Sequence, residues 1–201
     1  MHWIDSDEAL DAIYGKPSGA SVVKVTRRLT PAYQAWIERA RFCLLSSVGP
    51  EGTDCSPRGD AGAVVQVADP GTLLLPDWHG NNRIDSLRNI LHDGRVSLAF
   101  MVAGSNNVMR VNGTARLSTD PALLARFARG GKLPRLVIVI ALNEVYAQCA
   151  RALLRSELWM AGDCTQGLPS VGQMLAEITD GAIDGADYDA EWPRRAAATM
   201  W

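Results

Sequence analysis

The segment from Leu73 to Leu117 constrains the fold of this 201-residue chain most strongly. It contains a strand that ends at Leu75, a helical stretch over 82–91 and two further strand-like runs. In the helical stretch, the apolar residues recur at three- and four-residue spacing, which is typical of one buried helix face; they are Ile84, Leu87, Ile90 and Leu91. Pro76 is expected to end the first strand, because proline has no N–H to donate to a neighbouring strand.

The two later runs, 96–102 and 109–117, alternate between apolar and polar residues. Such alternation predicts strands that are buried on one side. In the second run the polar face carries Arg110, Asn112, Thr114 and Arg116. We therefore expect a sheet with one core face and one face that meets solvent, a ligand or a partner chain.

The rest of the chain adds short strands and short helices. Further strands are expected over 20–25, 42–48, 63–67 and 136–146, and the strand that ends at Leu75 is expected to begin at about 72. A turn over 49–52 is expected to form a hairpin that leads from 42–48 to 54–60. Helices are expected over 6–14, 30–40, 120–129, 150–154 and 171–179. Many strands with tight turns and few helices among them favour an antiparallel barrel of the α+β class over alternating βαβ units.

A chain of this length suits one domain, 1–201, with an N-terminal helical extension to about residue 41 and a C-terminal helical tail over about 160–201. The last stretch, 180–201, is rich in glycine, alanine and charged residues. We expect it to be loosely held.

Composition argues against several classes of function. A net charge of −2 gives no basic footprint for nucleic acid, and no apolar run approaches the length that spans a membrane. The N-terminal residues lack the basic start of a secretory signal, so a cytoplasmic location is expected. The four cysteines and three histidines show no ligand spacing, so no metal site is expected. No residue stands out as a general acid or base, and the catalytic residues are unknown.

Asn82 and Arg83 are predicted to lie at the start of the 82–91 helix, where they suggest an anion site. Unpaired N–H groups and the positive end of the helix dipole both favour a bound phosphate there. Arg83 would add a permanently charged, forked donor. The alternative is that Asn82 caps the helix and Arg83 is a solvated surface residue, which is the commoner arrangement.

Several motifs resemble those of the pyridoxamine 5′-phosphate oxidase-like flavoproteins, in particular a bacterial branch with an SPRGD signature. They are SPRGD at 56–60, PDWHGNNR at 76–83 followed by DSLRNIL, MRVNGTARL at 109–117 and RSELW at 155–159. The similarity covers roughly 37–159, and the joint order of the motifs is more specific than any one of them.

The resemblance implies a split β-barrel homodimer that carries FMN at the dimer interface. It places Arg58 and Arg83 on the FMN phosphate, and two cations on one dianion are chemically sensible. Asn82 departs from the arginine common at its position, although an amide also donates to phosphate. Pro76 and Asp77 align with the strand end along the isoalloxazine edge. Asp60 would orient Arg58 or meet the ribityl chain, with a plain turn role as the alternative.

The resemblance also draws in residues from later in the chain. Arg110 would meet the flavin or the other subunit, or else be an ordinary sheet-surface residue. Arg155, Ser156 and Trp159 match the segment that approaches the flavin from the partner chain. By itself, Trp159 would be interpreted as a core residue.

These features predict an FMN-dependent oxidoreductase for a small, flat, unknown substrate. Vitamin-forming oxidases have a C-terminal Arg-x-His segment, which Arg194-Arg195 does not reproduce, so pyridoxamine phosphate oxidation itself is not expected. The alternatives are a flavin-binding or flavin-sensing module without turnover, and a relative that takes deazaflavin or haem in the same cleft. Two arginines that face one phosphate favour the phosphorylated flavin.

Overall fold

A computed structural model describes all residues, 1–201. Its strands are β1 (Phe42–Gly49), β2 (Gly52–Gly59), β3 (Gln66–Asp69), β4 (Thr72–Asp77), β5 (Arg95–Met101), β6 (Val108–Ser118) and β7 (Leu136–Gln148). Its helices are α1 (Asp7–Tyr14), α2 (Gly19–Val23), α3 (Pro31–Arg39), α4 (Asp85–His92), α5 (Pro121–Ala125), α6 (Arg151–Ser156), α7 (Val171–Ile178) and α8 (Gly185–Thr199). None of these helices is both long and apolar enough to cross a lipid bilayer.

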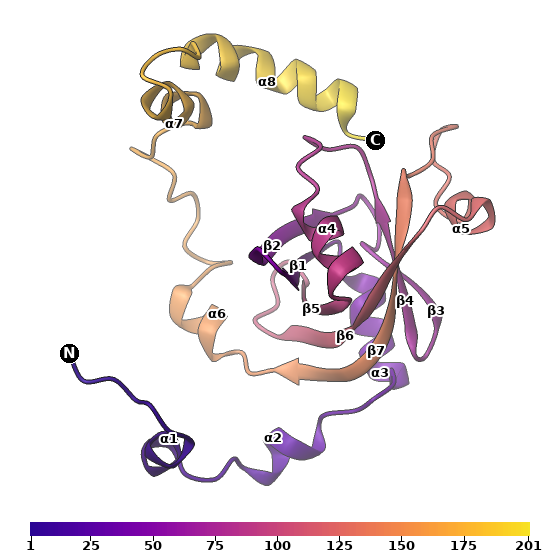
Figure 1. Cartoon of the computed structure of the whole chain (residues 1–201), viewed down its shortest axis with the longest axis vertical. Helices are drawn as coiled ribbons and strands as arrows, with labels where there is room; N and C mark the ends of the chain where they lie inside the picture. Colours follow the sequence, from indigo (N-terminus) through magenta and orange to yellow (C-terminus); the bar gives the residue numbers. More distant parts are fainter.

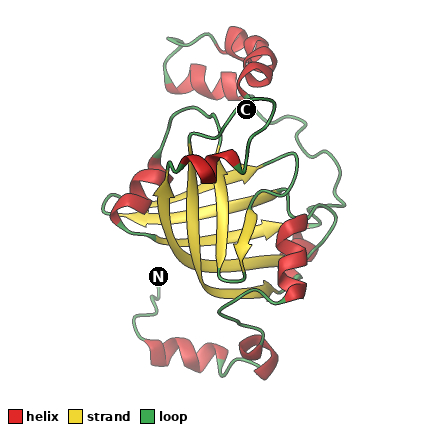
Figure 2. Cartoon of the chain, turned by 90° about the vertical axis from the view of Figure 1, so that its right-hand side faces the viewer, coloured by secondary structure: helices red, strands yellow, loops and turns green.

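The strands form one antiparallel sheet in the order β2-β1-β5-β6-β7-β4-β3, curled into the barrel in the centre of Figures 1 and 2. The predicted α+β class and antiparallel split-barrel architecture are therefore confirmed. The turn between β1 and β2 and the alternation of β5 and β6 lie where the sequence predicts them. On β6, Met109, Val111 and Ala115 are buried.

A single apolar core fills the barrel. Twenty buried residues form one cluster, to which α3 contributes Ile37, α4 contributes Leu87 and Ile90, and the strands contribute most of the rest. Each large apolar side chain buried in this way stabilises the fold by about 1.5–3 kcal/mol. The exposed face of α4 includes Leu91, which was predicted to lie on the buried stripe but is 72% exposed.

Pro76 does not end its strand, which corrects the prediction. The carbonyls of Gly71 and Asp77 accept hydrogen bonds from the β7 side, and β4 continues through Asp77. Because alternate residues of a strand face the same neighbour, Pro76 faces away from β7. On that side β3 pairs only as far as Leu74. The missing N–H of Pro76 therefore removes no hydrogen bond from the sheet.

The predicted strand over 20–25 is wrong, because this segment contains helix α2. Val22 and Val23 are exposed, and the segment meets the sheet only through an isolated bridge between Thr26 and Val145. A β-branched sequence forms a strand only where a partner strand is available, and none lies beside these residues.

The predicted start of the 82–91 helix is also wrong, because α4 begins at Asp85, with Ile84 as its N-cap residue. Asn82 has a φ of 61°, which is outside the right-handed helical range. Asn82 and Arg83 consequently lie in the loop before the helix, and Asn82 does not cap it.

The stretch 180–201 is more ordered than predicted. It contains helix α8, which packs against α7 at one end of the molecule. A Cβ atom on Gly172 would collide with the carbonyl oxygen of Gly185, so glycine allows the two helices to touch. Gly185, one of the glycines that suggested flexibility, therefore serves close packing instead.

Candidate functional site

A cavity of about 440 Å³ lies where the end of β2, the end of β4 and the loop before α4 meet the C-terminal segment. It is lined by Ser56, Pro57, Arg58, Gly59, Asp60, Val64, Leu75, Pro76, Asp77, Trp78, His79, Gly80, Asn81, Asn82, Arg83, Ile84, Leu87, Arg135, Trp192, Met200 and Trp201. Of the ten predicted site residues, six line this cavity: Arg58, Asp60, Pro76, Asp77, Asn82 and Arg83.

Arg58 and Asp77 form an ion pair on the cavity wall, with 2.6 Å between Nη1 and Oδ1. The pair joins the end of β2 to the end of β4. Both side chains are largely buried, with exposed fractions of 20% for Arg58 and 14% for Asp77. The Nε atom of Arg58 is buried and has no hydrogen-bond partner. The guanidinium is therefore held in place and keeps unused donor capacity.

Asp60 lines the cavity, and its carboxylate is already held by three donors. Its side chain is 6% exposed and accepts hydrogen bonds from Trp78 Nε1 at 3.1 Å, from Arg129 Nη2 at 2.6 Å and from the Gly62 amide at 3.1 Å. A buried carboxylate with three donors is well compensated. Asp60 thus links the SPRGD motif to the indole of Trp78.

The loop from Trp78 to Ile84 is held by contacts with Arg135 and by a hydrogen bond between two of its own residues. Arg135, just before β7, donates from Nη1 to Asn82 Oδ1 at 2.5 Å, and its Nη2 lies 3.1 Å from Nδ1 of His79. Asn81 Oδ1 accepts from the amide of Arg83 at 2.9 Å. The side-chain oxygen of Asn82 is therefore already engaged by a cation, while its amide nitrogen remains available as a donor.

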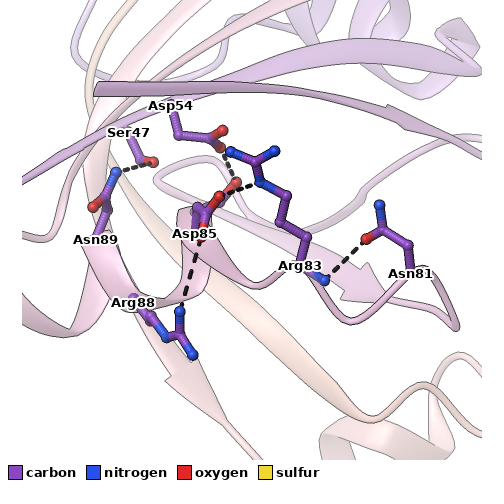
Figure 3. Close-up of polar contacts among 8 residues, drawn as sticks. Ser47, Asp54, Asn81, Arg83, Asp85, Arg88 and Asn89 are labelled. Atoms are coloured by element: carbon purple, nitrogen blue, oxygen red, sulfur yellow. Dashed lines mark hydrogen bonds and ion pairs between the residues drawn. The ribbon is translucent and has the colours of Figure 1, made fainter. Parts of the chain in front are cut away.

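Arg83 is on the rim of the cavity and is exposed. Its side chain is 79% exposed and donates from Nε to Asp85 Oδ2 at 2.6 Å (Figure 3). This hydrogen bond, together with the charge of Asp85, raises the pKa of Arg83. Arg83 thus lines the same cavity as Arg58, but its guanidinium is paired with the carboxylate of Asp85.

Two buried polar contacts fix α4 against the β1–β2 hairpin (Figure 3). Ser86 donates to Asp54, and Asn89 donates from Nδ2 to Ser47 Oγ at 3.2 Å. Ser47 and Ser86 are each 4% exposed. These contacts hold the helix that follows the Arg83 loop. Sequence analysis missed them, because they join residues far apart in the chain.

The other four predicted site residues do not reach this cavity. Arg110 lines a second cavity of about 360 Å³ on the side of β1, β5 and β6 that faces away from the core, where its Nη2 donates to Ser97 Oγ at 3.2 Å. Trp159 is half-buried and donates from Nε1 to the carbonyl of Ser105 at 2.7 Å. Ser156 bonds to the carbonyl of Leu153, and Arg155 is exposed. The roles of all ten residues toward a cofactor remain predictions.

Several cavity residues were not predicted as site residues. Arg135, Trp192, Met200 and Trp201 come from late in the chain, and no local motif marks them. Trp78 lies inside PDWHGNNR, so that motif was the one signal that pointed to it. Arg129 lies behind Trp201, with its guanidinium carbon 4.0 Å from the indole centroid.

The buried thiol of Cys43 is not a candidate nucleophile. Desolvation raises its pKa to about 12, although the charge of Arg58 acts in the opposite direction. The thiol therefore stays protonated and behaves as a small apolar core residue.

The chain was compared with models of known protein families. The family model described as pyridoxamine 5′-phosphate oxidase matches residues 29–149, more than half of the chain. The chain belongs to this family. The family match includes all strands and helices α3 to α5, and it excludes α1, α2 and α6 to α8. The predicted family membership is therefore confirmed.

Similar solved structures were also found. HupZ of Group A Streptococcus is 17% identical, with 59% of this chain and 93% of that chain covered and a TM-score of 0.49. General stress protein 26 of Bacillus anthracis is 14% identical, with 56% and 88% covered and a TM-score of 0.43. An FMN-binding protein of Syntrophomonas wolfei is 9% identical, with 71% and 96% covered and a TM-score of 0.47. A search of curated proteins gave no match.

Proposed function

We propose that this protein binds FMN in the cavity at Arg58 and is an FMN-dependent oxidoreductase for a small, flat substrate. The observation that carries the proposal is the guanidinium of Arg58, which is fixed by Asp77 and keeps a buried Nε without a partner. Membership of the pyridoxamine 5′-phosphate oxidase family supports it, since the family resemblance implies FMN. A charge-assisted bond to phosphate is among the strong hydrogen bonds.

The charge and size of the cavity fit a phosphorylated flavin. Arg58, Arg83 and Arg135 line it together with Asp60 and Asp77, so cationic groups are in excess. Its volume of about 440 Å³ falls within the range of about 300–1,000 Å³ typical of small-molecule sites. An open, positively charged cavity attracts a phosphate dianion.

Within this proposal the protein's own residues bind and orient. Arg58 and Arg83 hold the phosphate, Asp77 fixes the direction of Arg58, and Pro76 and the amide of Asn82 border the ligand. When bound, FMN supplies the hydride chemistry. No side chain on the cavity wall is assigned as a general acid or base.

The proposal includes a homodimer in which the polar sheet face around Arg110 and the segment around Trp159 meet the partner chain. Arg110 lies in the second cavity on this face, and Cys149 and Leu153 extend the same surface. Closed two-fold dimers are the commonest assembly of soluble proteins. Light scattering at micromolar concentration should give the mass of two chains, and a single-chain mass with FMN still bound would exclude an interface site.

A visible spectrum of the purified protein tests the cofactor. We expect the bands of oxidised flavin, release of FMN rather than FAD on denaturation, and bleaching by NADH or NADPH. Protein that stays colourless and takes up no FMN in a titration would refute flavin binding. Flavin that binds but is not reduced by any nicotinamide donor would support a binding or sensing module instead.

A further inference from the structure

Trp201 occupies one side of the cavity through a stack of aromatic and cationic groups. Its indole lies over the guanidinium of Arg129, 4.0 Å from the ring centroid to the guanidinium carbon, and meets the indole of Trp78 edge-on at 5.4 Å between centroids. The main-chain oxygen of Trp201 accepts a hydrogen bond from Lys132 Nζ at 2.9 Å. Trp201 thus lines the cavity and stacks on Arg129, which is not itself a lining residue.

Arg129 is incompletely satisfied beneath this ring. Its Nη2 donates to Asp60, but its Nη1 is buried and has no hydrogen-bond partner. An unpaired N–H of a charged group costs free energy when it is withdrawn from water. Trp78 also faces the guanidinium, at 5.7 Å from its ring centroid. Trp78 therefore offers a planar surface beside Arg129, whose Nη1 is an unused charged donor.

The attachment of Trp201 to the barrel is slight. Helix α8 packs mainly on α7, and in Figure 1 this pair of helices stands apart from the barrel while the C-terminal end reaches back to the loop before α4. An extended linker joins α7 to the rest of the chain. Removal of Trp201 from its place would thus break few contacts other than its own stack.

We propose that Trp78 and Arg129 form a subsite for a planar aromatic ligand that carries a carboxylate or a similar anion, and that Trp201 occupies this subsite until the ligand displaces it. A ligand would take the place of the indole: its carboxylate would accept from Nη1 at the edge of the Arg129 guanidinium, and its ring would lie against the indole of Trp78. Asp60 stays bonded to Nη2 and holds the guanidinium in position. This assignment rests on the proposed function in that it names the substrate class of the same cavity.

The test uses 2-naphthoate as the planar anion and 2-naphthalenemethanol as its neutral analogue. Calorimetric titrations of the full chain compare wild type with Trp201→Ala, Trp201→Ala/Arg129→Gln and Tyr188→Ala. Tyr188 is the matched control, because it is an aromatic residue of α8 stacked on a different arginine, Arg195, at 4.5 Å. Circular dichroism confirms that each variant is folded.

We expect Trp201→Ala to bind 2-naphthoate on the order of tenfold more tightly than wild type, since a charge-assisted bond then forms without displacement of the indole. The added Arg129→Gln change should abolish this gain, the neutral analogue should bind Trp201→Ala on the order of tenfold more weakly than 2-naphthoate because it forms no charge-assisted bond, and Tyr188→Ala should match wild type. Equal affinities in wild type and Trp201→Ala, or a gain that survives Arg129→Gln, would overturn the proposal.

FMN titrations of the same samples separate this proposal from the flavin proposal. Failure of every variant to bind FMN, with the naphthoate pattern intact, would refute the flavin site and leave the subsite standing. The naphthoate gain should persist in FMN-saturated protein. If saturation with FMN removes the gain, the stack belongs to the flavin ring itself, and the assignment to a separate ligand would be wrong.

Discussion

Arg58 and Arg83 both line the same cavity, yet their surroundings differ. Arg58 comes from a strand end, is 20% exposed and is paired with an aspartate that is 14% exposed. Arg83 comes from a loop, is 79% exposed and is paired with Asp85, which is 36% exposed. Arg58 is fixed in the cavity wall before any ligand arrives, whereas Arg83 is held only by an exposed ion pair.

The two arginines would therefore bind a phosphate differently, one as a fixed donor and the other as a mobile donor. A fixed donor loses little conformational freedom when the ligand binds, whereas a mobile side chain loses about 0.5–1.5 kcal/mol as it is immobilised. Arg83 must also exchange the carboxylate of Asp85 for the phosphate. If both arginines bind FMN, as we propose, Arg58 should therefore contribute more of the affinity.

Arg58→Ala should have the largest effect. It removes a charge-assisted bond worth about 1.5–3 kcal/mol and leaves Asp77 unpaired against the cavity wall. We expect FMN affinity to fall on the order of tenfold to a hundredfold and the free energy of unfolding to fall by about 1–3 kcal/mol. Fluorescence titration with FMN and urea denaturation measure the two effects.

Riboflavin is the control for this variant, because it lacks the phosphate. Wild type and folded Arg58→Ala should bind riboflavin with similar affinity. An equal loss of riboflavin and FMN affinity would show a distorted site rather than a lost phosphate contact. Asp77→Asn tests the positioning role, and it should weaken FMN less than Arg58→Ala because the arginine itself remains.

Arg83→Ala should reduce FMN affinity roughly tenfold and change stability by no more than about 0.5 kcal/mol. The small stability effect follows from its exposed ion pair, since such pairs contribute little. FMN titration with thermal denaturation of the same sample measures both. Unchanged FMN affinity would identify Arg83 as a surface residue, and the double variant with Arg58→Ala should lose less than the sum of the single losses.

Much of the barrel could be predicted from local pattern. The alternation in 96–102 and 109–117 gave strands close to β5 and β6, and the turn between Gly49 and Gly52 gave the first hairpin. These elements are decided by which side chains face the core, and that information is local. The segment 20–25 shows the limit, because its β-branched residues have no neighbouring strand and form a helix.

The candidate site was predictable only where motifs mark it. SPRGD and PDWHGNNR pointed to Arg58 and Arg83, and both line the cavity. The stack of Trp78, Arg129 and Trp201 joins three distant parts of the chain, so no spacing rule reveals it. The loop before α4 was misjudged because Asn82 takes a left-handed conformation, which a helical pattern of apolar residues does not show.

FMN affinity should also depend on pH, because the arginines bind the charge of the phosphate, but this effect should be smaller than those of the arginine substitutions. A phosphate monoester loses its second negative charge as the pH falls through about 6. The pKa of Arg83 is raised, and arginines remain charged throughout this range, so the change arises on the ligand. We expect a roughly few-fold loss of FMN affinity between pH 7.5 and 5 in wild type. Riboflavin affinity should stay constant, and a parallel fall for riboflavin would place the titrating group on the protein.

Asp85→Asn should have the smallest effect and tests whether the pairing of Arg83 opposes phosphate binding. The amide keeps the size of the side chain but removes the charge that holds Arg83 at 2.6 Å. Because an exposed ion pair is worth only about 0–1 kcal/mol, its release should raise FMN affinity by no more than about fivefold. Calorimetric titration measures the change, with Asp85→Asn/Arg83→Ala as the control, in which the gain should vanish. A loss of affinity as large as that of Arg83→Ala would reverse the interpretation, since Asp85 would then direct Arg83 toward the phosphate rather than compete with it.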